Sequence, residues 1–118
     1  MNKVILLGRL TNDPNLTYSA NNGTGVARFT LAIDREYNRE ETDFISCVAF
    51  GKTAEVISEY FVKGKPINLT GRIQTGSYET KEGEKRYTTD VIVETFNFIP
   101  TDNTTKEEPK QTYKKGRR

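Results

Sequence analysis

A single helical pattern inside a chain of strand patterns restricts the fold of this protein more than any other feature of its sequence. Residues 26–34, VARFTLAID, alternate between two faces, and Ala27, Phe29, Leu31 and Ile33 form the apolar one. This period of two is typical of a β-strand that buries one face. Further strand patterns cover residues 2–10, 44–50, 66–74 and 85 to about 99.

The helical pattern covers residues 53–63. Val56, Ile57, Tyr60 and Phe61 fall on one side at helical spacing. Thr53 is a residue type that caps helix N-termini, and Gly64 is the type that follows helix C-termini. We therefore predict a helix over 53–63.

Three strands, one helix and two strands predict an all-β fold, the OB fold. This is a five-stranded Greek-key barrel that binds oligonucleotides or oligosaccharides in many proteins. The helix would lie between strands three and four, and a long hairpin turning at 81–84 would join strands four and five. We expect residues 1–99 to form this domain and residues 100–118, which lack periodicity, to form a disordered basic tail.

The residue inventory argues against an enzyme. The chain has no histidine, so its one cysteine, Cys47, lacks the base that a thiol nucleophile needs. A single cysteine also makes neither a disulfide nor a cysteine-rich metal site. No apolar run approaches the roughly 18 residues that cross a membrane, and the start lacks a signal-peptide pattern. We predict a non-enzymatic cytoplasmic protein without a cofactor or a metal.

Charge alone does not indicate a nucleic-acid partner. The net charge of +2 combines a net of −1 over residues 1–99 with a net of +3 over residues 100–118. A nucleic-acid interface would therefore depend on where cations and aromatic rings are placed.

The strand at 44–50, FISCVAF, carries apolar residues on both faces. If the small residues Cys47 and Ala49 fill the crowded barrel interior, Phe44 and Phe50 point outward and mark a binding surface. In the opposite arrangement, Phe44 and Phe50 fill the core and Ile45 faces outward. The alternation favours the first arrangement and leaves the second open.

Two tyrosines extend the outward aromatic set. Tyr78 shares strand parity with Arg72 and Gln74, although a bulge near Gly76 would break that count. Tyr37 lies in a charged segment that offers no core. Rings and cations together predict a stacking platform, because every base has a face that stacks and cations meet the phosphates. The cations that suggest it are Lys3, Arg28, Lys52 and Arg72. The acidic neighbours of Tyr37 oppose phosphate binding.

The first strand also has two apolar faces. Val4 and Leu6 lie on one face, and Ile5 and Leu7 lie on the other. Either a second subunit covers the extra face, or the chain's own helix or loop buries it.

These residues bear a resemblance to a known family. Over about residues 1–99 the chain resembles the bacterial and phage single-stranded DNA-binding proteins. The segments that carry the resemblance are NKVILLGRLTNDP, VARFTLAI, FGKTAEVISEYFVKG, LTGRIQT and RYTTDVIV.

The resemblance implies an OB fold, a homotetramer with the first strand in a subunit contact, and binding of single-stranded DNA during replication, recombination and repair. The family's stacking positions match Tyr37, Phe44, Phe50 and Tyr78, and its cationic positions match Lys3, Lys52, Lys63 and Arg86. Positions that are usually basic or hydrogen-bonding are Ile45, Ser46, Gly76 and Ser77 here, so fewer phosphate contacts are expected.

The tail departs from the family pattern. It ends KKGRR rather than in an acidic, hydrophobic tip, so recruitment of repair or replication enzymes through such a tip is not expected. The alternative function is that of an OB-fold accessory protein, of the replication-restart type, that works mainly through protein contacts.

Overall fold

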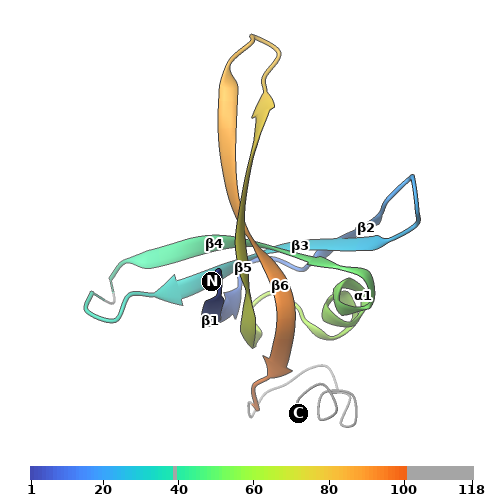
Figure 1. Cartoon of the computed structure of the whole chain (residues 1–118). Helices are drawn as coiled ribbons and strands as arrows, with labels where there is room; N and C mark the ends of the chain where they lie inside the picture. Colours follow the sequence, from blue (N-terminus) through green and yellow to red (C-terminus); the bar gives the residue numbers. More distant parts are fainter. Residues whose placement is uncertain (39, 101–118) are drawn as a thin grey trace.

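The computed structural model describes residues 1–38 and 40–100, which form six strands and one helix (Figure 1). The elements are β1 (Val4–Leu10), β2 (Asn15–Tyr18), β3 (Gly25–Asp34), β4 (Thr42–Phe50), α1 (Gly51–Tyr60), β5 (Pro66–Glu79) and β6 (Lys85–Phe98). The predicted tail, from residue 101 onward, lies outside the described residues.

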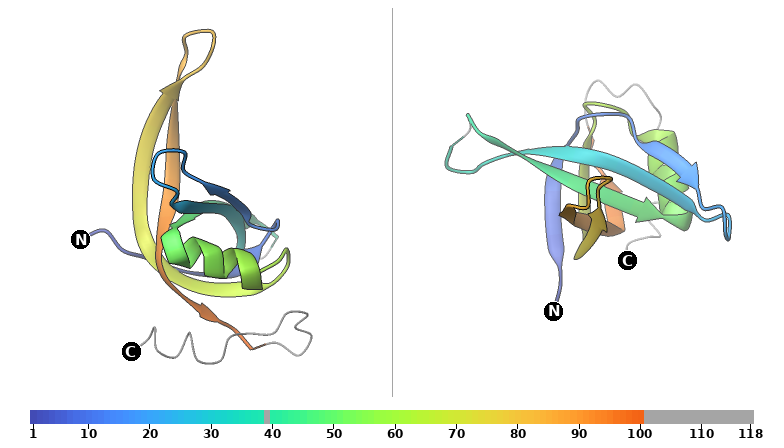
Figure 2. Two further views of the ribbon diagram at one scale, coloured as in Figure 1. Left: turned by 90° about the vertical axis from the view of Figure 1, so that its right-hand side faces the viewer. Right: turned by 90° about the horizontal axis from the view of Figure 1, so that it is seen from above.

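Five strands form a closed ring in the order β1, β5, β6, β4, β3, and a short β1–β3 pairing completes it (Figure 2). All the pairings are antiparallel except β4–β6, which is parallel at Cys47–Val91 and Val48–Ile92. The predicted ring of five strands with one helix is confirmed. β2, which pairs with the far edge of β3, is an additional strand, so the helix follows the fourth strand rather than the third.

The ring interior is the hydrophobic core. Side chains such as Leu31, Cys47 and Leu69 are fully buried in it. α1 packs on β3 and β4 and contributes Ala54 and Ile57 to the same core. The interior is thus filled by side chains, and any large ligand must bind outside the ring.

α1 begins at Gly51, two residues before the predicted start, and ends at Tyr60. Thr53 is therefore inside the helix and is not its N-cap. Gly51 has a φ of 65°, in the left-handed region that glycine adopts without strain. This backbone turn leads β4 directly into α1, so the helix begins without a side-chain cap.

A bulge in the β5–β6 pairing brings two strands unusually close together at Gly71. The register shifts between Thr70 and Gly71, which leaves Glu94 as the extra residue on β6. A Cβ atom at Gly71 would lie within hard contact of the Ile92 carbonyl oxygen and 3.2 Å from the Val91 side chain. Only glycine fits this position.

Gly71→Ala is therefore expected to destabilise the fold by about 1–3 kcal/mol or more, because the Ile92 backbone must move to admit the methyl group. Urea unfolding of this variant measures the effect. Gly76→Ala is the matched control in the same strand, since its Cβ would meet only the Thr88 hydroxyl at 3.2 Å. Equal stability of the two variants would contradict this account of the bulge.

β5 and β6 continue beyond the ring as a two-stranded arm (Figure 1). Their register is unbroken from Gly71–Val93 to Glu79–Lys85, and the arm turns at residues 80–84 with Gly83 at a φ of 87°. Since no bulge occurs near Gly76, Tyr78 lies on the face of Arg72 and Gln74. Across residues 1–38 and 40–100, no helix is long and apolar enough to cross a membrane.

Candidate nucleic-acid interface

β4 directs its two phenylalanines away from the core. Phe44 is 66% exposed and Phe50 is 46% exposed, whereas Cys47 and Ala49 are fully buried inside the ring. The arrangement with both phenylalanines in the core is therefore wrong. Closure of the ring decides between the two faces, because only small side chains fit the interior where β4 passes β3 and β6.

A row of side chains crosses the outer surface of the strand ring between the side chains of Phe44 and Phe50. Arg28 pairs with Val48, Val48 with Ile92, and Ile92 with Arg72. Paired residues lie on one face of a sheet, so two apolar side chains form a floor between two arginines. Val48 and Ile92 are only 3% and 8% exposed. The floor itself is therefore almost covered, and the two arginines are the part of this row that a phosphate can reach.

The arm carries a second aromatic–cation pair. Tyr78 is exposed and lies directly opposite Arg86 on the same face of the arm. Arg86 donates a hydrogen bond of 2.9 Å from its guanidinium to the Glu84 carboxylate, and both side chains are exposed. On this face of the arm, the Tyr78 side chain thus lies beside a cation, Arg86, that forms an ion pair with Glu84.

Tyr37 stands apart from these groups, in the loop between β3 and β4, and its side chain is almost fully exposed. At the base of this loop, Arg35 donates to the carboxylates of Glu41 and Asp43. The hydrogen bond to Asp43 and its charge raise the pKa of Arg35. Two of the acidic residues that the sequence places near Tyr37 are thus ion-paired at the base of the loop.

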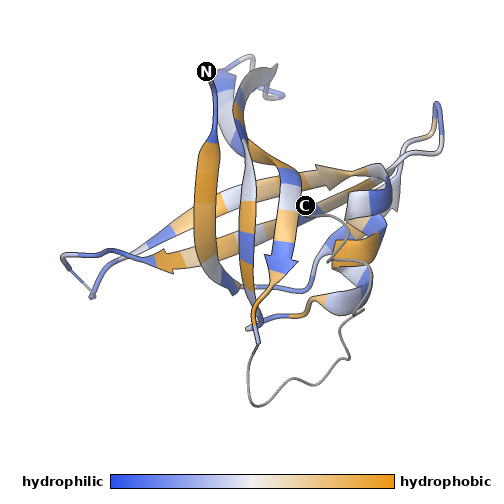
Figure 3. Ribbon diagram, turned by 60° about the horizontal axis from the view of Figure 1, so that its bottom comes forward, coloured by the Kyte–Doolittle hydropathy of each residue, from blue (hydrophilic) through white to orange (hydrophobic). Residues whose placement is uncertain are grey.

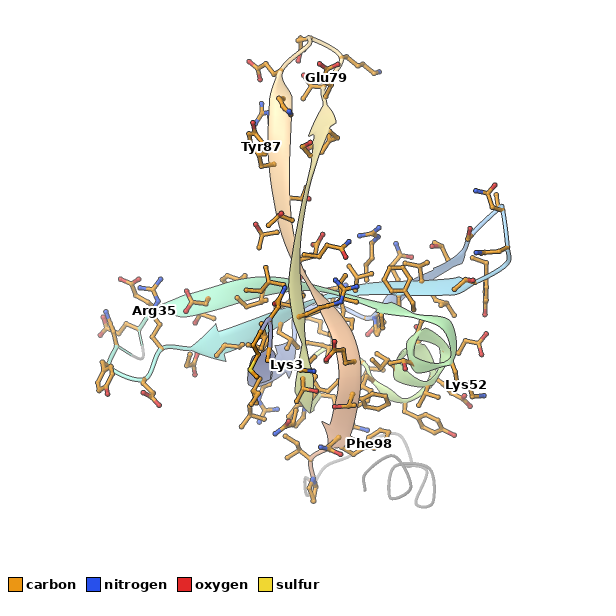
Figure 4. The ribbon with its side chains drawn as sticks, viewed as in Figure 1. Lys3, Arg35, Lys52, Glu79, Tyr87 and Phe98 are labelled. Carbon is orange, nitrogen blue, oxygen red and sulfur yellow. The ribbon has the colours of Figure 1, made fainter. Side chains whose placement is uncertain are left out.

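The remaining predicted cations come from different elements; Figure 4 shows Lys3 near β1 and Lys52 on α1. Lys52 lies in the first turn of α1, beside Phe50 in the sequence, and is exposed. Lys63 follows α1, where its backbone N–H donates to the Asp13 carboxylate at 2.8 Å. Lys3 donates to the Glu94 carboxylate at 2.7 Å. Strand pairing thus brings Arg28 and Arg72 to the outer face of β4, and Lys52 follows Phe50 at the start of α1.

The outward face of β1 is apolar and open in the single chain. Ile5 is 76% exposed and Leu7 is 57% exposed, while Val4 and Leu6 pack against the core. Figure 3 shows the hydrophobic run along β1. Neither α1 nor a described loop covers Ile5 and Leu7, so the alternative of burial under the chain's own elements is wrong for residues 1–38 and 40–100.

Cys47 has no chemical role that the structure supports. Burial, with a smaller contribution from the Asp90 carboxylate, raises the pKa of Cys47 to about 12. The thiol therefore stays protonated at neutral pH, and neither a nucleophile nor a metal ligand is available from it.

Sequence comparison decides which family has this architecture. The model of the single-strand binding protein family matches residues 1–99, which cover the ring, the helix and the arm. The chain belongs to this family. Family membership implies the OB fold that the ring of strands predicts, and it implies a DNA-binding protein without enzymatic activity.

Curated relatives agree with the family assignment. A single-stranded DNA-binding protein of Clostridium perfringens is 57% identical over 103 residues, which are 87% of this chain and 69% of the relative. Single-stranded DNA-binding protein 2 of Clostridium acetobutylicum is 50% identical over 84% of this chain and 77% of its own length. A single-stranded DNA-binding protein of Enterococcus faecalis is 44% identical over 84% of this chain and 54% of its own length.

In this single-strand binding protein, two of the cations that the resemblance predicts to bind phosphate, Lys3 and Arg86, form ion pairs with carboxylates. The bulge exposes Glu94 at the point where Lys3 reaches it, 91 residues away in the sequence. Strand patterns do not signal this pair, because neither the bulge nor the meeting of the two side chains follows from local sequence. A phosphate that binds Lys3 must compete with the Glu94 carboxylate and its charge.

Glu94→Gln is therefore expected to tighten DNA binding and to steepen its salt dependence, since Lys3 becomes available to phosphate. The slope of log K against log salt should grow by about 0.7, the value for one added contact on a single strand. Fluorescence titration of oligo-dT at several salt concentrations measures this slope. Glu55→Gln, which removes a carboxylate on α1 that contacts the neutral Tyr18 hydroxyl, is the charge-matched control. An unchanged slope in Glu94→Gln would show that Lys3 does not meet phosphate.

Two exposed aromatic side chains, Tyr18 and Tyr87, do not belong to the predicted stacking set. Tyr87, on β6 of the arm, is as exposed as Ile5. Its place in RYTTD, next to Arg86, is the signal that was available.

Proposed function

We propose that this single-strand binding protein binds single-stranded DNA without sequence specificity by stacking bases on its outward aromatic side chains. The observation that carries this proposal is that Phe44 and Phe50 lie exposed on one face of β4, with the Arg28–Arg72 row between them. Exposure of two such apolar rings to water is unfavourable, and stacking of a base on each ring would remove that apolar surface from water.

The side chains have two kinds of role in this proposal. Stacking positions bind any base, because every base presents a π-face. Cations meet phosphates and contribute a salt-dependent part of the free energy of binding. The stacking residues are Tyr37, Phe44, Phe50 and Tyr78. The phosphate-binding residues are Arg28, Lys52, Lys63 and Arg72, with Lys3 and Arg86 added where phosphate competes with their carboxylate partners.

Residues 1–99 act as the DNA-binding domain, and four such domains assemble as the family's tetramer. The apolar strip of Ile5 and Leu7 forms a subunit contact, with Val4 and Leu6 behind it on the core side of the strand. Two adjacent exposed aliphatic side chains on one strand are typical of a surface that a second subunit covers.

We further propose that the protein acts in the cytoplasm, where its free, buried Cys47 remains reduced. There it protects single strands that replication, recombination and repair expose.

Titration of dT oligomers of several lengths, with the mass of the complex measured in parallel, tests the function. We expect a tetramer and a dissociation constant well below the about 10⁻⁴–10⁻⁶ M of nonspecific association at physiological salt. Affinity that does not exceed this range would contradict the proposal. It would favour an accessory protein that works through protein contacts.

A further inference from the structure

The β5–β6 arm has an aromatic side chain on each of its two faces. Tyr78 lies opposite Arg86 on one face, whereas Tyr87 lies opposite Ser77 on the other. Neighbouring residues of a strand point to opposite faces, so Arg86 and Tyr87 cannot share a face. The side chain of Tyr87 is 76% exposed, and Figure 4 shows it on the arm, away from the ring.

The surroundings of Tyr87 repeat the combination of ring and cation that the proposed stacking sites have. The Lys85 Nζ lies 5.8 Å from the centre of the Tyr87 ring. Thr75, Ser77 and Thr89 occupy the same face and offer hydroxyl groups. Glu79 lies opposite Lys85, so this face has no net charge and any base must be held mainly by stacking.

The arm is also narrow enough for one DNA strand to reach both faces. Beyond Arg72 the arm pairs with no further strand of the described ring, since the β1–β5 pairing ends at Gly71 and β6 meets β4 only at Val91 and Ile92. Two strands are about 5 Å apart in a sheet. A nucleotide chain on the Tyr78 face therefore meets the Tyr87 face after it crosses one strand edge.

We infer that Tyr87 is a further base-stacking residue, with Lys85 beside it for phosphate, and that single-stranded DNA passes from the Tyr78 face of the arm to the Tyr87 face. This inference rests on the proposed function and extends it. The DNA strand then wraps around the arm, and both faces of the arm contribute to the length of DNA that each subunit binds.

The composition of the Tyr87 face favours nucleic acid over a second copy of the chain. Hydroxyl groups and two opposite charges surround the ring, whereas the cores of subunit interfaces are depleted of charged residues. The strip of Ile5 and Leu7 on β1 has the apolar character that a subunit contact needs. The polar face with one ring and one cation suits a base and its phosphate.

Three tyrosine variants of the full chain test the inference with oligo-dT. Tyr87→Ala is expected to weaken binding by at least about fivefold, the low end of the range for one stacked base, and Tyr87→Phe is expected to keep the affinity. Tyr18→Ala is the matched control, because Tyr18 is also exposed but lies on β2 beside Glu55 of α1. Ultraviolet crosslinking to a dT oligomer with 5-iodouracil, read by mass spectrometry, should label Tyr87.

The outcomes separate this inference from the proposed function. Unchanged affinity in Tyr87→Ala, together with weakened binding in Phe50→Ala, would overturn the inference and leave the proposed function standing. A smaller assembly mass in Tyr87→Ala would also overturn it, because this face would then be a subunit contact. Unchanged affinity in both variants would overturn both proposals. Weakened binding in Tyr87→Ala at constant mass, with Tyr87 crosslinked, would support the inference.

Discussion

Replacing both Phe44 and Phe50 with alanine is expected to weaken oligo-dT binding by about 2–6 kcal/mol, which is at least a thirtyfold loss of affinity. Each stacked base contributes about 1–3 kcal/mol when its aromatic partner is removed. The two rings are six residues apart on one strand, about 20 Å, so their effects should add. The chain has no tryptophan, so quenching of intrinsic tryptophan fluorescence cannot report the binding. A fluorescently labelled dT oligomer is used instead.

The fold should tolerate this double change, since both side chains are exposed in the single chain. Thermal unfolding of the variant checks this point. Tyr18→Ala again serves as the control for loss of an exposed ring outside the proposed path. A folded double variant that binds oligo-dT as tightly as the unaltered chain would remove the β4 face from the DNA-binding site.

The second large effect concerns assembly. The double change Ile5→Asp and Leu7→Asp is expected to dissociate the tetramer at micromolar concentration. It removes about 3–6 kcal/mol of apolar burial per chain and places unpaired carboxylates in the contact. Light scattering at matched concentrations measures the mass of the assembly.

Thr17→Asp is the control for this variant, because it adds a carboxylate to another exposed strand position, on β2. We expect that variant to keep its tetramer. A tetramer that persists in the Ile5 and Leu7 variant would show that the subunits meet through a different surface.

Periodicity predicts the framework of this fold well. The strand expected at 26–34 spans Gly25–Asp34, and the arm turns at the expected residues. Strict alternation is a strong signal because one face of each strand is buried. Four-residue β2 gave no comparable signal, since a short edge strand shows too few alternations.

Other features depend on backbone geometry that side-chain patterns do not record. The start of α1 was misplaced because Gly51 makes the turn with its φ angle, without a capping side chain. Alternation alone left the direction of Phe44 and Phe50 open, because both faces of β4 are apolar. Closure of the ring orients them, and closure depends on pairings between strands far apart in the sequence.

The cations of the site were the hardest part to predict. Their residue types and exposed positions follow from the sequence, but their partners do not. Lys3 and Arg86 hold carboxylates in the structure, and Arg35 holds two. An exposed ion pair of this kind stabilises the fold little, yet its carboxylate competes with phosphate for the cation. Most of the free energy of DNA binding is therefore expected to come from stacking.

Salt dependence tests this central claim most directly. Oligo-dT binding is titrated from low salt to about 1 M with an oligomer that covers one subunit. We predict a slope of log K against log salt no steeper than about −3.5, the value for the five cations Arg28, Lys52, Lys63, Arg72 and Lys85 while Lys3 and Arg86 stay with their carboxylates. Substantial affinity should be left at about 1 M. A steep slope, with affinity that disappears at high salt, would contradict the account and make phosphate contacts the main source of binding.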